Sequence, residues 1–161
     1  MSQSVTIREG KKEDIPHVLQ LIKELALYEK APDEVVVSED QMLEYGFGKE
    51  TYFKFIVAEI NHQIVGISLY YIRYSTWKGP MLYLEDLVVN ENFRGNGIGH
   101  LLFKETMRIA HQNNYVGMIW QVLDWNEPAI NFYNKYNASY SDEWLNGKLS
   151  QQQLKDYFSK S

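Results

Sequence analysis

The segment between Val88 and Gly99 is the part of the chain whose residue types and spacing most clearly allow chemistry. A valine-rich stretch runs into Arg94-Gly95-Asn96-Gly97-Ile98-Gly99 and then into an amphipathic stretch. Glycines let the backbone approach a ligand and direct successive N–H groups at one point. The start of a helix adds partial positive charge, and Arg94 adds a full one. This turn therefore predicts a site for a pyrophosphate group.

Two other nucleotide-binding patterns do not match this turn. A Walker A loop places Lys and then Ser or Thr after its last glycine, whereas His100 follows Gly99 here. The dinucleotide-binding fingerprint spaces its glycines as G-x-G-x-x-G, and the three glycines of this turn are spaced differently. On these residues alone, a glycine-rich helix start that binds no ligand remains the alternative.

Two adjacent acids, Glu85 and Asp86, interrupt an otherwise apolar stretch. In a regular strand, alternation would place their side chains on opposite faces. Charges beside Leu84 and Leu87 are costly unless they are paired. The pair therefore predicts either a site that binds a cation or accepts a proton, or a structural ion pair, and the residues alone leave both readings open.

Composition excludes several classes of function. The 161 residues fit one domain over 1–161, and the absence of Cys excludes disulfides, thiolate metal ligands and a Cys nucleophile. The four His residues show no ligand spacing, so we expect no metal. A net charge of −5 argues against a nucleic-acid partner. With no apolar stretch of the roughly 18–20 residues that a membrane span needs, and no signal-peptide pattern, we expect a cytoplasmic protein without a membrane partner.

Hydrophobic periodicity predicts an α/β fold with a mixed, mostly antiparallel central sheet and helices on both faces. A capping box of Ser38 and Gln41 predicts the start of a short helix that ends near residues 46–48. Asn61-His62 predicts a hairpin turn. In the helix over 97–113, we expect Leu101, Leu102, Met107 and Ala110 to face inward. The other expected elements are strands over 4–9, 52–60, 63–74, 81–89, 116–123 and 139–145, and helices over 14–29, over 126–136 and from Ser150.

The glycine-rich turn resembles a known motif. Arg94-x-x-Gly97-x-Gly99 after a valine-rich strand is similar to the acetyl-CoA motif of the GNAT superfamily of N-acetyltransferases. Further blocks, in the same order over nearly the whole chain, resemble the diamine (spermidine/spermine) acetyltransferase family. These blocks are Leu21-Ile22-Lys23-Glu24-Leu25-Ala26, Gly46-Phe47-Gly48, Tyr83-Leu84-Glu85-Asp86 and Trp125-Asn126-Glu127-Pro128-Ala129-Ile130-Asn131-Phe132-Tyr133.

Two branches of that family share these blocks. The stretches 74–79 and 122–126 resemble the branch associated with thialysine N-epsilon-acetylation, and the polyamine branch carries Asp where Ser75 stands. Losing a carboxylate there removes one attraction for a polycation. Asn126-Glu127-Pro128, by contrast, looks like the polyamine branch, so both acceptors remain open, with Ser75 and Thr76 favouring thialysine.

The resemblance implies a GNAT fold and direct transfer of an acetyl group from acetyl-CoA to the primary amine of a small molecule. It also implies Tyr133 as general acid for the departing thiolate, and Glu85 as the residue that takes the amine proton, directly or through water. The implied acetyl-CoA-binding residues are Leu87, Val88, Val89, Arg94, Gly95, Asn96, Gly97, Ile98, Gly99, His100, Asn126 and Phe132. The implied substrate-binding residues are Tyr28, Glu29, Ser75, Thr76, Glu85, Asp86, Asp142 and Trp144.

The chain departs from the family pattern at two places. Asn137 stands where the family usually has Gly, and Asn tolerates the left-handed conformation needed there. Asn146-Gly147 interrupts a C-terminal strand that helps members of the family form homodimers. The resemblance nevertheless implies a homodimer. A non-catalytic acetyl-CoA-binding module and a protein N-terminal or lysine acetyltransferase remain as alternative functions.

Overall fold

The computed structural model describes residues 4–160. It divides into two compact units, Met1–Leu123 and Asp124–Ser161, and each is described by itself below. The expectation of one domain over residues 1–161 stays a prediction.

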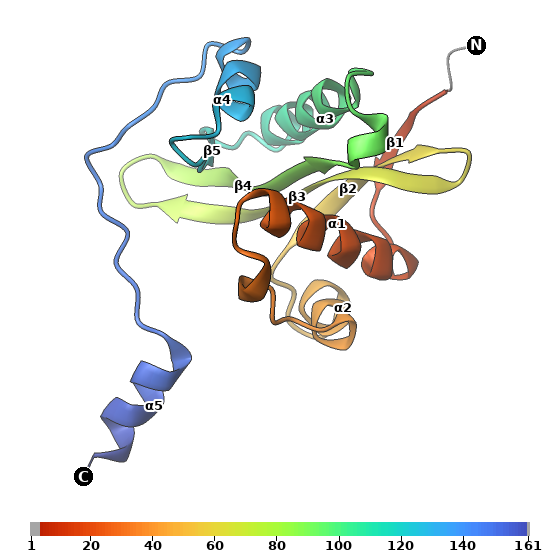
Figure 1. Ribbon diagram of the computed structural model, residues 1–161. Coiled ribbons are helices and arrows are strands. Elements are labelled where there is room, and N and C mark those ends of the chain that lie inside the picture. The colour runs from red at the N-terminus through yellow and green to blue at the C-terminus, as the bar shows by residue number, and fades with distance from the viewer. Residues whose placement is uncertain (1–3, 161) are drawn as a thin grey trace. The chain divides into compact units, whose positions relative to one another are not determined.

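The first unit is built on one five-stranded sheet with the order β1-β2-β3-β4-β5 (Figure 1). The first four strands pair antiparallel, and β5 lies parallel to β4. The predicted mixed, mostly antiparallel sheet is therefore confirmed. The strands are β1 (Thr6–Glu9), β2 (Lys54–Ile60), β3 (Gln63–Ser75), β4 (Gly79–Val89) and β5 (Met118–Trp120), the last much shorter than the predicted 116–123.

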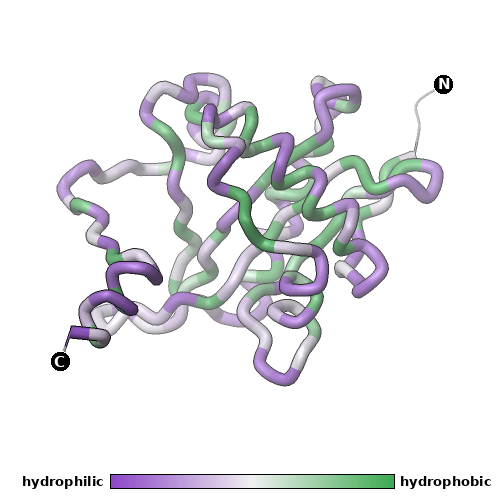
Figure 2. Tube along the Cα trace, turned by 60° about the horizontal axis from the view of Figure 1, so that its bottom comes forward, coloured by the Kyte–Doolittle hydropathy of each residue, from purple (hydrophilic) through white to green (hydrophobic). Residues whose placement is uncertain are grey.

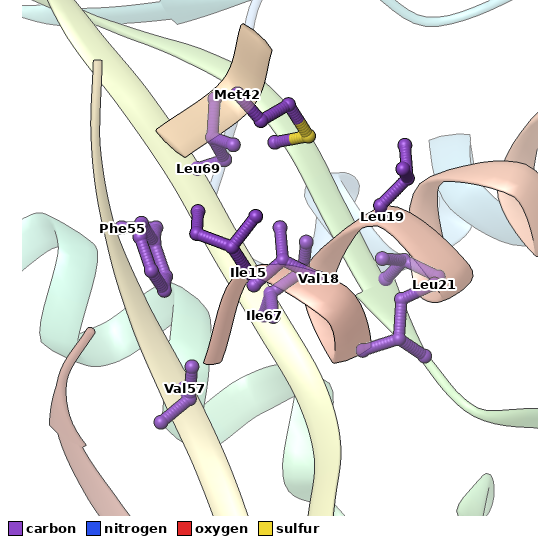
Figure 3. Packing of buried hydrophobic residues seen from close by; sticks show 10 residues of the cluster. Ile15, Val18, Leu19, Leu21, Met42, Phe55, Val57, Ile67 and Leu69 are labelled. Atoms are coloured by element: carbon purple, nitrogen blue, oxygen red, sulfur yellow. The ribbon is translucent and has the colours of Figure 1, made fainter. Parts of the chain in front are cut away.

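Helices cover both faces of this sheet, as predicted. On one face lie α1 (Ile15–Tyr28) and α2 (Glu39–Phe47), and on the other lies α3 (Ile98–Gln112). Alternation along β2 divides its side chains between two cores: Phe55 and Val57 pack with α1, while Ile56 and Ala58 pack with α3. Figure 3 shows the first core, in which α1 side chains meet those of β2 and β3. Along the tube of Figure 2, hydrophobic segments are frequent in the interior, while hydrophilic segments lie at the outer turns and alternate with hydrophobic ones along the helical coils.

Local sequence signals for turns and caps are confirmed. The amide of Gln41 donates to Ser38 Oγ at 3.1 Å, and the amide of Ser38 donates to Gln41 Oε1 at 2.9 Å. Asn61 and His62 both have positive φ, at 50° and 64°, as a two-residue type I′ hairpin turn requires. Three short 3₁₀ helices occupy other connections: η1 (Lys12–Asp14), η2 (Pro32–Glu34) and η3 (Glu91–Phe93).

The inward face of α3 differs from the prediction at one position. Leu101 is 42% exposed, so its predicted inward orientation is wrong. The buried side chains at 98, 102, 106 and 110 follow the four-residue helical repeat, which turns 101 toward the solvent. One of them is polar: Thr106 Oγ1 donates to the carbonyl of Leu102 at 2.8 Å and is therefore the acceptor for the hydroxyl of Ser68 on β3, 2.7 Å away. This buried pair fixes α3 on the sheet.

An ion-pair network fixes the start of α1. Arg8 on β1 donates to both carboxylate oxygens of Asp14, at 2.8 and 3.0 Å, and to Glu59 on β2 at 2.8 Å. Asp14 also accepts from the amide of Lys11 at 2.8 Å. Although burial acts against ionisation of Asp14, the bonds from Arg8 and Lys11 outweigh it and lower the pKa of this carboxyl. The network ties β1, β2 and the entry into α1 together.

The second unit contains two helices, α4 (Glu127–Asn134) and α5 (Gln151–Ser159). Asn126 begins α4, with its side chain accepting from the amide of Ala129 at 3.4 Å, and Asn137 follows the helix with a left-handed φ of 60°. Ser150 begins α5, as predicted, and forms a capping box with Gln153. The predicted strand over 139–145 is wrong, because the exposed stretch 141–150 contains acids, Asn and Gly, and its backbone pairs with no strand of the described residues.

Candidate functional site

The predicted pyrophosphate turn lies between η3 and α3. Arg94, Gly95, Asn96 and Gly97 are all exposed, and Gly97 is the N-cap of α3. Gly95 and Gly97 have φ of 82° and 78°, and a Cβ built on either would meet no atom within 4 Å. Glycine is therefore required by backbone conformation and not by crowding. The first N–H groups of α3 have no partner within the helix, which suits binding of an anion.

Arg94 ties this turn to two neighbouring elements. Its Nε donates to the carbonyl of Val89, at the end of β4, with a distance of 3.0 Å. Its guanidinium carbon lies 5.8 Å from the ring centroid of Tyr28, at the end of α1, within cation–π distance. The structure thus brings the predicted anion-binding turn next to Tyr28, which the sequence had assigned to the substrate.

A β-bulge in β4 determines how the two adjacent acids lie. Leu69 pairs with Asp86, but the next residue, Tyr70, pairs with Leu84, so Glu85 is an extra residue on β4. Because paired residues share a face, Asp86 lies on the α1 face with Leu69, while Leu84 lies on the α3 face with Tyr70. The predicted alternation does not hold through the bulge, and Glu85 and Asp86 are not separated on opposite faces.

Two carboxylates, Glu85 and Glu29, act on a third, Asp86, at this bulge. Burial, then Glu85, then Glu29 at the end of α1 raise the pKa of Asp86 to about 7. Burial also raises the pKa of Glu29. Glu85 itself is exposed. The predicted residues Glu29, Glu85 and Asp86 therefore form an acidic group that attracts a cation and contains a carboxyl that titrates near neutral pH.

Two tyrosines beside this acidic group were not predicted as site residues. Tyr71 and Tyr83 pair across β3 and β4 with their rings stacked at a centroid distance of 5.1 Å, and the guanidinium carbon of Arg73 lies 5.9 Å from the Tyr83 centroid. Burial and then the charge of Glu85 raise the pKa of both phenols, and a hydrogen bond with Glu85 adds to the effect on Tyr71. Both phenols stay protonated at neutral pH. Residues two apart in a strand lie on the same face, so the position of Tyr83, two residues before Glu85, was the signal in the sequence that could have identified it.

The backbone of β4 after the bulge pairs with β3 and not with β5. Leu87, Val88 and Val89 pair with β3, whereas the pairing of β4 with β5 covers only Leu82–Leu84 within the described residues. Strand pairing on the β5 side of β4 therefore ends before Glu85. This geometry suits the predicted contact of the 87–89 backbone with an extended ligand arm.

The other predicted residues of the first unit have local structural roles. Ile98 is buried in the second core, while Gly99 and His100 are half-buried in the first turn of α3. Ser75 accepts from the amide of Lys78 at 3.2 Å in the β3–β4 turn, next to the exposed Thr76. Six residues of strand separate this turn from the bulge, about 20 Å. Within one chain, the structure does not bring Ser75 and Thr76 to the acidic group.

The predicted residues of the second unit lie on α4 and in the segment after it. Tyr133 is 8% exposed and meets the Phe132 ring edge-on at a centroid distance of 5.3 Å. Asn126 is buried, whereas Asp142 and Trp144 are exposed. The roles predicted for these residues, including Tyr133 as general acid, stay predictions.

Metal clusters, membrane-crossing helices and pockets were sought in the described part of the chain. No cluster of three or more His, Asp or Glu in residues 4–160 could hold a metal ion. Among those residues, no helix is both long and apolar enough to cross a membrane. A pocket of about 480 Å³ lies at the C-terminal end of α3, away from the glycine turn, and is lined by Thr51, Tyr52, Phe53, Lys54, Tyr70, Tyr71, Ile72, Ile109, Asn113 and Tyr115.

Comparison with known proteins identifies similar sequences. The Acetyltransferase (GNAT) family matches residues 18–138. Thialysine N-epsilon-acetyltransferase of Bos taurus is 40% identical over 142 residues, which cover 83% of this chain and 84% of that protein. Spermidine/spermine N(1)-acetyltransferase-like protein 1 of Homo sapiens is 34% identical over 160 residues, covering 93% of this chain and 23% of that protein.

Solved structures show the same fold. An integron cassette protein from the mobile metagenome of V. cholerae matches with a TM-score of 0.78 at 27% identity, over 99% of this chain and all of that one. An aminoglycoside N-acetyltransferase solved in complex with CoA matches with a TM-score of 0.74 at 16% identity, over 92% of this chain and 97% of that one.

The raised pKa of Asp86 predicts a cost to stability. Because the folded state binds the proton of Asp86 more tightly than the unfolded state, folding is favoured as the pH falls through 7 and is opposed above it. Asp86→Asn removes this cost. At pH 8, urea denaturation should show a free energy of unfolding that is higher by about 1–4 kcal/mol, a gain that fades as the pH falls toward about 4.

The exposed Asp33→Asn is the matched control and should give little change at either pH. A gain from Asp86→Asn that is the same at both pH values, or a loss of stability at pH 8, would contradict the assignment.

Proposed function

Because the chain belongs to the acetyltransferase (GNAT) family, we propose that it transfers an acetyl group from acetyl-CoA directly to the primary amine of thialysine or a related small diamine-like molecule. The observation that carries this proposal is the acidic group of Glu29, Glu85 and Asp86, which lies on the same elements that position Arg94 and Tyr28. A cationic acceptor is attracted at the bulge of β4, on the strand that leads into the glycine turn.

The acyl donor fits the glycine turn by its chemistry. A pyrophosphate carries negative charge, and the N-terminus of α3 together with Arg94 supplies N–H donors and positive charge. The part of β4 that is unpaired toward β5 offers backbone groups to the pantetheine arm. In this proposal one N–H of residues 87–89 polarises the thioester carbonyl.

The acceptor fits the acidic group. An amine that enters as an ammonium ion is held by the carboxylates, and the rings of Tyr71 and Tyr83 offer a stacked aromatic surface beside them. A carboxylate of the group, assigned from the sequence as Glu85, takes a proton, and the free amine attacks the thioester carbon. The C–S bond then breaks, and Tyr133 donates a proton to the departing thiolate.

A polyamine acceptor is the second candidate. Two further carboxylates that act on Asp86 suit a molecule with several positive charges, and a spermidine/spermine acetyltransferase-like protein is among the relatives. Thialysine is preferred because relatives from several animals carry that name at identities of up to 40% and because Ser75 and Thr76 resemble that branch.

A homodimer belongs to the same proposal. The segment from Trp144 to Phe158 carries apolar side chains that are 45–97% exposed, namely Trp144, Leu145, Leu149, Leu154, Tyr157 and Phe158. A second copy of the chain would remove this apolar surface from water. A cytoplasmic location stays a prediction.

A parallel acetyl-CoA assay against thialysine, lysine, ornithine, putrescine, spermidine and spermine tests the acceptor. We expect the highest kcat/KM for thialysine. A preference for spermidine or spermine would establish the second candidate, and no turnover with any of the six amines would refute the small-amine function.

Tyr133→Phe tests the general acid. Removing the phenol proton should lower kcat by about 10²–10⁴-fold, because proton donation to the leaving group typically contributes that much. Calorimetric titration should show unchanged affinity for acetyl-CoA. Tyr136→Phe, which alters a tyrosine one turn further along, is the control and should retain kcat; an unchanged kcat for Tyr133→Phe would remove the acid role.

Arg94→Ala tests the anion-binding turn. Loss of one charge-assisted contact should weaken acetyl-CoA binding by about 10–100-fold in a calorimetric titration. Arg108→Ala, on the exposed side of α3, removes the same charge away from the turn and should leave the affinity unchanged. Equal affinities for the two variants would refute the pyrophosphate assignment.

A further inference from the structure

We propose that Arg73 binds the carboxylate of the acceptor, so that the site selects amino acids with a primary amine at the end of the side chain over diamines and polyamines, which lack that carboxylate. This inference rests on the proposed amine acetylation, in which the acidic group of Glu29, Glu85 and Asp86 holds the ammonium ion. Arg73 was not among the site residues predicted from the sequence.

Arg73 lies on the same face of the sheet as the acidic group. Along β3, residues two apart share a face, so Leu69, Tyr71 and Arg73 all lie on the α1 side. Asp86 is the partner of Leu69 across the strands. Tyr83 is the partner of Tyr71, and paired residues share a face. The acidic group, the two tyrosines and the arginine therefore follow one another along a single face of β3 and β4.

The guanidinium of Arg73 is positioned by an aromatic contact. Its carbon lies 5.9 Å from the centroid of the Tyr83 ring, within cation–π distance. Tyr83 in turn stacks on Tyr71 at a centroid distance of 5.1 Å. No carboxylate of residues 4–160 forms an ion pair with the exposed Arg73, so its planar set of N–H donors is available to an anion.

Charges of opposite sign act on this pair of rings from the two directions along the strands. Burial raises the pKa of the Tyr71 and Tyr83 phenols, the charge of Glu85 raises it further, and the charge of Arg73 acts in the opposite sense. In the register of β3 and β4, Glu85 lies on one side of the tyrosine pair and Arg73 on the other. The face is therefore negative at one end and positive at the other, which matches a zwitterion whose ammonium and carboxylate are well apart.

The spacing of the two ends fits an amino acid acceptor. Arg73 is four residues beyond Leu69, the partner of Asp86, which is a separation of about 13 Å along the strand. In extended lysine or thialysine, the side-chain nitrogen lies about 7–8 Å from the carboxylate carbon, by ordinary bond lengths. A hydrogen bond of about 3 Å at each end brings the total to about 13–14 Å. The acceptor can therefore contact both ends while its methylene groups cover the tyrosine rings.

Arg73 also disfavours acceptors that lack a carboxylate. When one ammonium ion of a diamine is held by the acidic group, the second lies along the same face and approaches a guanidinium of like charge. Specificity often combines an attraction for one ligand with repulsion of its competitor. One side chain thus has both effects here, because a guanidinium forms paired hydrogen bonds with a carboxylate and repels a second cation.

Acceptors that differ only by the carboxylate test this inference. Thialysine and its decarboxylated analogue form one such pair, and lysine and cadaverine form another. We expect wild type to have a lower KM for each amino acid than for its decarboxylated partner. Arg73→Gln should raise the KM of the amino acids by about 10–100-fold, through loss of a charge-assisted pair, and leave kcat largely unchanged. The KM of the two diamines should stay the same or fall.

Two further variants separate recognition of the carboxylate from other effects. Arg73→Lys keeps the charge but not the planar fork, so it should restore part of the lost affinity for the amino acids. A merely structural effect through the Tyr83 ring would raise the KM of both members of a pair equally, because both use that ring surface. Arg108→Gln removes an arginine from the exposed side of α3 and is the matched control, which should change neither KM.

Two outcomes separate this inference from the proposed function. If wild type is active but Arg73→Gln raises the KM of both members of a pair equally, or of neither, Arg73 does not bind the carboxylate, and the transferase function stands. If wild type acetylates none of these amines, NMR titrations of the protein with thialysine and with its decarboxylated analogue give a reading without turnover. Tighter binding of thialysine that is lost in Arg73→Gln supports the inference, whereas equal binding of the two, or none, overturns it.

Discussion

A single extra residue in β4 determines the geometry on which the rest of the site depends. Because Glu85 has no partner of its own on β3, the strand changes which face its side chains occupy between Leu84 and Asp86. Val88 therefore reaches the α1 core and Val89 the α3 core, while Asp86 is carried to the face where Glu29 ends α1. One local irregularity thus connects the packing of both cores with the electrostatics of the acidic group.

The acidic group lowers the stability of the fold, whatever its role in binding. Burying a carboxyl beside two others costs free energy, since its ionised form is poorly hydrated and repelled. The fold tolerates it because well-satisfied interactions lie elsewhere, such as Arg8 with Asp14 and Glu59, and the buried hydroxyl pair of Ser68 and Thr106. In the proposed function, a bound cation would offset the repulsion that these carboxylates exert in the free protein.

Sequence reasoning worked where the signal is local. The capping box at Ser38, the two-residue turn at Asn61 and the left-handed Asn137 each depend on a few consecutive residues, and all were found. The bulge at Glu85 and the missing strand over 139–145 depend on pairing with distant segments, which period-two patterns do not encode. Glu29 and Asp86 were both predicted as site residues, but the effect of Glu29 on the pKa of Asp86 also depends on distant segments and was not predictable. Tyr71, which lies opposite Tyr83, was missed altogether.

The glycine turn before α3 has a consequence for chirality. Gly95 and Gly97 have positive φ in open space, so L-residues are disfavoured there by backbone conformation and not by the size of their side chains. A D-alanine at either position would favour that φ. Such a mirror-image residue would restrict the backbone of the anion-binding turn to its observed conformation, whereas an L-alanine there would carry the strain of positive φ.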